Sequence, residues 1–193
     1  MAIVAGGFDV TECRRAAAAI EADLLQLANT LTEAQFHAPP RGGGWSIGYC
    51  VEHLVLSGKA FLPTWDAALG KAARNKSGEE AALPYTWWQR KILHFVENPA
   101  RLRHKSPALL APCSRRSIDE TVGRFLDMHR ELVRRLDASR SLDLRHSKVQ
   151  SPFVSWPSFE LGFSFDLCLA HERRHLSQAW RVSREVKAGN PTV

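Results

Sequence analysis

Residues 158–186 read SFELGFSFDLCLAHERRHLSQAWRVSREV, and this pattern ends at Gly189-Asn190-Pro191. On a helical wheel at 100° per residue, one side is polar and is expected to face water: Arg173, Arg174, Ser177 and Arg181. The opposite side carries His171 and His175 among small and apolar residues. The stretch is therefore predicted to form a long amphipathic helix that packs its histidine side against the rest of the chain.

Apolar residues also recur at three- and four-residue steps in three earlier stretches. The first follows Asp9 and runs to a turn-rich break at Pro39-Pro40. The second covers about residues 45–70, and the third starts at Ser117. Asp9 and Ser117 are each followed three residues later by a glutamate, a spacing typical of the capping box that satisfies free amides at a helix start. Nothing in the sequence reads as a strand ladder.

Long irregular connections separate the later helices. Residues 73–116 contain four prolines and one short helical pattern, Trp87–Glu97, and residues 139–157 precede the last helix. These features predict an all-α fold, a four-helix bundle with long connections after the second and third helices. Residues 1–193 are expected to form a single domain.

Composition and charge exclude several classes of protein. The 193 residues are 45% hydrophobic and 24% charged, which excludes a disordered chain, a collagen-like repeat and a disulfide-dense miniprotein. The formal net charge is +6, but the arginine pairs are scattered along the sequence, so we expect no nucleic-acid partner. No apolar run approaches the ~20 residues of a membrane-spanning helix, so we expect no membrane partner. Four cysteines without CxxC spacing, and a start without a secretory signal, predict a reduced cytoplasmic protein.

His171 and His175 are the sharpest chemical signal in the sequence. Side chains four residues apart lie on one face of a helix, so both imidazoles can reach one metal ion. Imidazole suits zinc, nickel, copper and iron(II), so the spacing indicates a transition metal without selecting one. In a chain with 8 histidines such a pair also occurs by chance, and the alternative is a core or surface pair that binds no metal.

Glu172 lies between these two histidines, inside the inward-facing arc of the wheel. Because a buried unpaired charge is costly, this carboxylate is expected to pair with a cation, orient a ligand or act as a base. The five residues 171–175 also match HExxH, in which the glutamate is the general base of a zinc metalloprotease. The chain offers no histidine or glycine where such proteases carry their next ligand, so this interpretation is disfavoured.

A third ligand is therefore expected upstream, and His53 is the best candidate. It lies at the margin of the apolar side of the second helix. Its flanking residues are small and leave room for a cavity: Ser46, Cys50 and Ser57. The alternative for a single histidine in this position is an interior residue held by hydrogen bonds.

Trp45-Ser46-Ile47, then His53-Leu54, and much later Ala170 to Gln178 together resemble the DinB/YfiT-like metalloenzyme superfamily. That family is a four-helix bundle with one histidine ligand from its second helix and two from an HxxxH on its fourth. The resemblance implies His53, His171 and His175 as metal ligands. It covers nearly the whole chain in helix order, but residues 74–116 match nothing assignable.

The same resemblance carries expectations about function. Three histidines without a fourth protein ligand imply an open coordination position, as in catalytic metal sites. Relatives include transferases and isomerases that use low-molecular-weight thiols such as bacillithiol or mycothiol. The resemblance thus implies a zinc or nickel enzyme that transfers a thiol to a small electrophile, with Glu172 as a catalytic base or a supporting group. Metal-dependent hydrolysis is the runner-up, and a non-catalytic, stress-associated binding protein is the alternative from another class. A small-molecule substrate and a homodimer are the expected partners.

Other side chains receive weaker interpretations. His129 is expected in the interior, with a place in the lining of the pocket as the alternative, and Gln178 could orient a ligand or form a packing amide. Packing roles are expected for Tyr85 and Trp87-Trp88, with the wall of a substrate cavity as the alternative. Cys50 and Cys168 are expected to behave as small hydrophobes. No role is assigned to the remaining histidines: His37, His94, His104 and His146.

Overall fold

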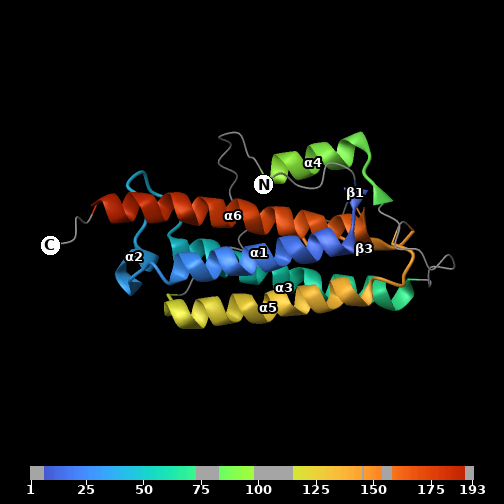
Figure 1. Cartoon of the computed structure of the whole chain (residues 1–193), viewed down its shortest axis with the longest axis horizontal. Helices are drawn as coiled ribbons and strands as arrows, with labels where there is room; N and C mark the ends of the chain where they lie inside the picture. The colour runs from blue at the N-terminus through green and yellow to red at the C-terminus, as the bar shows by residue number, and fades with distance from the viewer. Residues whose placement is uncertain (1–6, 73–82, 98–114, 145, 154–157, 190–193) are drawn as a thin grey trace.

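The computed structural model describes residues 7–72, 83–97, 115–144, 146–153 and 158–189 (Figure 1). Four long helices dominate it: α1 (Val10–Ala28), α3 (Ile47–Lys71), α5 (Ile118–Ala138) and α6 (Leu161–Gly189). The prediction of an all-α four-helix bundle is confirmed. None of the helices in the described ranges is long and apolar enough to cross a membrane.

The helices pack as a square, in which α3 contacts α5 and α6, and α1 contacts the same two helices from the other side. In Figure 1, α1 and α6 run in one direction and α3 and α5 run in the other. Because α3 and α5 are parallel, the chain must return along the bundle between them. This return includes α4 (Trp87–Glu97), which packs against α6 outside the square. The parallel pair explains why the predicted connection before the third bundle helix is so long.

Two predicted helix starts are confirmed by their caps. The Asp9 carboxylate accepts the N–H of Glu12 at 2.9 Å, and the Ser117 hydroxyl accepts the N–H of Glu120 at 3.2 Å. The first pattern is split, however, because α1 ends at Ala28 and a short helix, α2 (Glu33–His37), follows. Thr32 forms a full capping box for α2, and this local hydrogen bonding competes with continuation of α1.

The structure also contains two short antiparallel strand pairs that the sequence interpretation missed. β1 (Gly7–Phe8) pairs with β2 (Leu83–Pro84), and β3 (Lys148–Gln150) pairs with β4 (Ser158–Glu160). The last helix therefore begins at Leu161 and not at Ser158. Strands of two or three residues are too short to show an alternating hydrophobic pattern, so no sequence pattern indicates them.

The core lies between the four long helices. Trp65, Phe125 and Phe165 are fully buried there, and the Trp65 indole donates to the Ser164 hydroxyl at 2.9 Å. α3 and α5 approach closely at Gly58, where an added Cβ would clash with the sulfur of Met128. This close approach brings the first half of α3 deep into the bundle.

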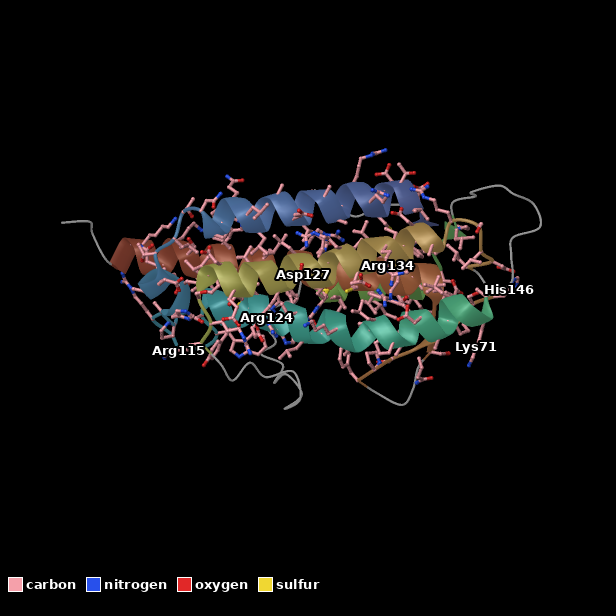
Figure 2. The ribbon with its side chains drawn as sticks, turned by 90° about the horizontal axis from the view of Figure 1, so that it is seen from below. Lys71, Arg115, Arg124, Asp127, Arg134 and His146 are labelled. Carbon is pink, nitrogen blue, oxygen red and sulfur yellow. The ribbon has the colours of Figure 1, made fainter. Side chains whose placement is uncertain are left out.

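The outer side of the bundle is charged, and Figure 2 shows α5 with Asp127 and Arg134, both solvent-exposed, on that side. α4 departs from this pattern, because Trp87 and Trp88 are 55% and 69% exposed. The predicted packing role is therefore wrong for this pair of tryptophans. It holds for Tyr85, which is buried and donates its hydroxyl to the carboxylate of Asp166.

Candidate metal centre

Three imidazoles from distant parts of the chain meet between α3 and α6. Their candidate ligand nitrogens all lie within 4.8 Å of one another: His53, His171 and His175. Nε2 of His53 is 3.2 Å from Nε2 of His171, and the His53 and His175 ring centroids are 4.6 Å apart. The structure thus brings together the three histidines that the sequence singled out.

The start of α3 positions His53. Gly43 and Gly44 have φ angles of 72° and 121°, values that glycine adopts without steric cost and that turn the chain toward the helix. Ser46 then caps α3, because its hydroxyl accepts the N–H of Tyr49 at 3.2 Å. His53 follows about two turns into the helix, where its side chain is 4% exposed.

Trp45, which immediately precedes this cap, covers one side of the histidine cluster. Its ring centroid lies 4.8 Å from that of His53 and 5.8 Å from that of His175, with the second pair stacked. The sequence interpretation used Trp45 only as part of a motif and missed this packing. An apolar residue directly before a helix cap, with a histidine eight positions later, was the available signal.

α6 supplies the other two imidazoles from successive turns, with ring centroids 4.6 Å apart. His175 is 6% exposed, whereas His171 is only half-buried. The cluster is therefore closed on the side of His53 and His175 and reaches solvent beside His171.

Both histidines of α6 are held in the neutral form. Burial, assisted by the nearby histidines and Arg174, lowers the pKa of His171 to about 3 and that of His175 to about 2. Neutral imidazole has a free ring-nitrogen lone pair, and this is the form that binds metal ions. Nδ1 of His175 is also buried without a hydrogen-bond partner among the described residues.

The donor set fits a divalent transition metal. Two nitrogens bound to one zinc ion at 2.0–2.1 Å in tetrahedral geometry lie roughly 3.3 Å apart. The 3.2 Å between Nε2 of His53 and Nε2 of His171 matches this separation. Among the described residues, no cysteine, aspartate or glutamate joins the three imidazoles, so a tetrahedral ion would keep one position open.

Glu172 points away from this cluster toward the centre of the bundle. Its carboxylate lies 3.2–3.4 Å from Nδ1 of His129 on α5, and both side chains are 1% exposed. Nε2 of His129 lies 3.1 Å from the carbonyl oxygen of Ala17, which can only accept, so Nε2 carries a hydrogen. Burial lowers the pKa of His129, but Glu172 and the hydrogen bonds outweigh burial, and the pKa is raised.

Of the three roles weighed for Glu172, the structure shows pairing, with His129 as the partner, and the raised pKa of His129 favours the cationic form of that partner. The predicted interior position of His129 is confirmed. The role of Glu172 as a catalytic base stays a prediction.

Glu52, the neighbour of His53, fixes α3 against the start of α5. One of its carboxylate oxygens accepts from Arg116 at 2.9 Å and from Arg124 at 3.1 Å. Figure 2 shows Arg124 on α5, on the side nearer α3. The buried pairing of Glu52 with two arginines holds the backbone that carries His53, and no sequence spacing revealed it.

The cysteines, Gln178 and the other histidines named in the sequence analysis differ in their environments. Burial raises the pKa of Cys50 to about 12 and raises that of Cys168, so neither thiol ionises at neutral pH. Burial lowers the pKa of His175, and a side-chain hydrogen bond with Gln178 opposes this lowering without reversing it. His146 lies in Figure 2 at the end of the bundle where α3 finishes, and His104 lies outside the described residues.

Comparisons with known proteins agree with this architecture. The chain is similar over 94% of its length to YfiT from Bacillus subtilis, described as "a probable metal-dependent hydrolase with an unusual four-helix bundle topology". The similarity covers 89% of that protein, with a TM-score of 0.59 and 18% sequence identity, and it supports the fold. Comparison with curated proteins finds no significant match. The model of the DinB superfamily matches residues 16–179, and the chain therefore belongs to the DinB superfamily.

Proposed function

We propose that His53, His171 and His175 hold one divalent transition-metal ion, zinc or nickel, and that the protein is a metal-dependent enzyme acting on a small molecule. The observation that carries this proposal is the convergence of three imidazoles, two buried and one half-buried. Neutral ligands add no negative charge to an ion, so its attraction for an anionic fourth ligand is not reduced. A divalent ion held there would lower the pKa of a thiol or water molecule bound beside it.

Transfer of a thiol to a small electrophile is the reaction that this geometry supports best. Metal-assisted hydrolysis is faster with a base beside the bound water, and Glu172, the sequence neighbour of His171, is engaged with His129 in the core. A thiol loses its proton to solvent more readily, and its sulfur then forms a bond to an electrophilic carbon, whose leaving group departs with the electron pair. Two side chains bound the place where this reaction would occur. Trp45 packs on His53 and excludes water on one side, and the other side, beside the half-buried His171, is where substrate would enter.

Metal-dependent hydrolysis is the second candidate, because the structural relative YfiT is described as a hydrolase of this type. Under that reaction Glu172 would have to exchange His129 for water as its partner. The predicted cytoplasmic location and homodimer stay predictions.

Metal analysis of protein purified without added ions tests the proposal. We expect about one transition-metal ion per chain in the parent, and loss of that ion in His53→Ala and His171→Ala. His146→Ala is the matched control, because this side chain is 80% exposed and lies at one end of the bundle. A parent protein without metal, in preparations where the control folds normally, would contradict the proposal and favour the non-catalytic binding protein.

A second measurement separates the two reactions. The metal-loaded protein is assayed with low-molecular-weight thiols and 1-chloro-2,4-dinitrobenzene, and in parallel with simple esters and amides. Thiol-dependent turnover that Glu172→Gln leaves intact supports thiol transfer. Because Glu172 also pairs with His129 in the core, Glu172→Gln is first shown to unfold cooperatively above the assay temperature; ester or amide hydrolysis that this folded variant lacks supports the hydrolase.

A further inference from the structure

The outer side of α4 is an apolar surface exposed to solvent. Five large hydrophobic side chains are exposed in the described ranges, and four of them lie on this helix. Their exposed fractions are 55% for Trp87, 69% for Trp88, 37% for Ile92 and 46% for Phe95. Single exposed apolar side chains are normal, whereas a contiguous group of them marks a binding surface. These four side chains are called the α4 face below.

The bundle holds α4 by its opposite side. Gln89, Leu93 and Glu97 recur at four-residue steps and so share one side of the helix. Gln89 donates to Glu160 at 3.2 Å near the start of α4. Glu97 accepts from Arg173 at 2.7 Å near its end, and Leu93 between them is 3% exposed. Figure 1 shows α4 outside the square of long helices, beyond α6 and away from α5. The α4 face is therefore a convex ridge, held in place from behind.

Basic side chains accompany the α4 face. Lys91 follows Trp87 by one turn, and its Nζ lies 5.1 Å from the centre of the Trp87 ring. Arg90 precedes Lys91, and neither of them pairs with a carboxylate of any described residue. The only acidic residue of α4 is Glu97, which is engaged by Arg173 on the inner side. The outer side thus combines apolar rings with uncompensated positive charge, in a chain of net charge +6.

The size and charge of this surface fit an anionic lipid surface better than a second copy of the chain. An aromatic side chain presents ~150–250 Å², so the exposed parts of the α4 face amount to roughly 300–500 Å². Each partner of a standard protein interface buries ~800 Å². A two-fold pairing of two such ridges would also bring Arg90 and Lys91 toward their own copies. A helix on a membrane, in contrast, buries only its apolar face ~5–10 Å deep and gains from anionic headgroups.

We propose that α4 binds the protein to the surface of an anionic membrane. The α4 face enters the boundary between headgroups and acyl chains, and Arg90 and Lys91 contact lipid phosphates. Tryptophan is enriched at this boundary because its ring is apolar while its N–H stays hydrated. The expectation of no membrane partner rested on the lack of a spanning segment, and a helix bound at the surface needs none. Membrane binding by α4 is independent of the metal centre.

Co-sedimentation of the full chain with vesicles tests this proposal. One set of vesicles is phosphatidylcholine alone, and the other contains phosphatidylcholine and phosphatidylglycerol in equal amounts. One variant combines Trp87→Gln with Trp88→Gln, and another combines Arg90→Gln with Lys91→Gln. Glutamine is a good helix former, and all four positions except Gln89 between them are exposed, so α4 should keep its fold. Thermal unfolding midpoints equal to that of the parent check this.

Two matched controls change residues of the same kind elsewhere. Leu25→Gln removes the remaining exposed large hydrophobic side chain, which is 37% exposed on α1. Arg130→Gln with Arg134→Gln removes two exposed positive charges from α5, on the far side of the bundle from α4. The assays use physiological ionic strength, at which charges more than ~8 Å from the lipid are largely screened.

We expect the parent to bind the anionic vesicles roughly tenfold or more tightly than the neutral ones, because each basic residue near an anionic surface adds about a factor of five. Each of the two α4 variants should weaken binding to the anionic vesicles roughly tenfold or more. Both controls should bind as the parent does, and so should His171→Ala, which removes a proposed metal ligand.

The proposal is overturned if the parent does not bind anionic vesicles, if the tryptophan variant binds them as well as the parent, or if the α5 control loses as much binding as the Arg90 and Lys91 variant. Sedimentation velocity without lipid examines the other occupant of this surface. A dimer of the parent that Trp87→Gln with Trp88→Gln dissociates would make the α4 face a contact between copies and would likewise overturn membrane binding.

Discussion

The buried pair of Glu172 and His129 allows a quantitative prediction about stability. Both side chains are 1% exposed and lie 3.2 Å apart at their closest atoms. Removing one partner of a buried ion pair leaves the other charge without compensation and costs about 3–5 kcal/mol. His129→Leu should therefore lower the free energy of unfolding by that amount at neutral pH. For a domain of this size, at roughly 2–4 °C per kcal/mol, the midpoint temperature should fall by about 6–20 °C.

A second substitution identifies the origin of this loss. In His129→Leu with Glu172→Met, apolar side chains of similar volume replace the whole pair, so no uncompensated charge remains in the core. Replacing a buried pair in this way is often nearly neutral, and the double variant should recover to within about 2 kcal/mol of the parent. The carbonyl of Ala17, which loses the His129 contact, lies within α1 and keeps its helical hydrogen bond.

Urea unfolding at pH 7 measures both effects, with an unchanged m-value as the check that two-state behaviour is preserved. His146→Leu is the control for a histidine-to-leucine change at an exposed position. The reasoning is refuted if His129→Leu costs less than ~1 kcal/mol, well below the loss expected for a broken buried pair. It is also refuted if the stability losses of His129→Leu and of Glu172→Met, each measured alone, simply add in the double variant.

Three further predictions concern the same bundle. Because the pKa of His129 is raised in the folded protein, its pairing with Glu172 stabilises the fold fully below the unfolded-state pKa, and this stabilisation is lost as pH rises through the folded-state pKa. The urea midpoint of the parent should therefore fall between neutral and alkaline pH, and that of the double variant should not. Zinc at one hundred times its dissociation constant should stabilise the parent by about 2.7 kcal/mol and leave the stability of His171→Ala unchanged, as measured by thermal unfolding. Equal shifts of the unfolding midpoint in the two proteins would contradict binding at this cluster. Burial raises the pKa of Cys50 to about 12, so iodoacetamide at pH 8 should label this thiol only after denaturation, as mass spectrometry of the digested protein would reveal.

Local features were predictable from the sequence because the interactions that form them span a few residues. The caps at Asp9 and Ser117 depend on hydrogen bonds to backbone amides three residues away. The shared face of His171 and His175 follows from helical periodicity alone. Even α4, a helix of 11 residues outside the square of long helices, has the bounds that its pattern predicted.

Interactions between distant residues were decided only by the tertiary structure. Glu172 pairs with a histidine 43 positions earlier, and Glu52 pairs with arginines 64 and 72 positions later. A helical wheel indicates that such side chains face inward, but it does not indicate which helix stands opposite.

Sequence patterns were thus enough to assign the long helices, their amphipathic faces and the residues able to bind a metal ion. The packing of α3 against α6 determined that His53 reaches His171 and that Trp45 covers the cluster. Helix formation and capping depend on neighbours within about one turn. Convergence of side chains depends on how whole helices pack, and packing is set by the complete set of buried contacts.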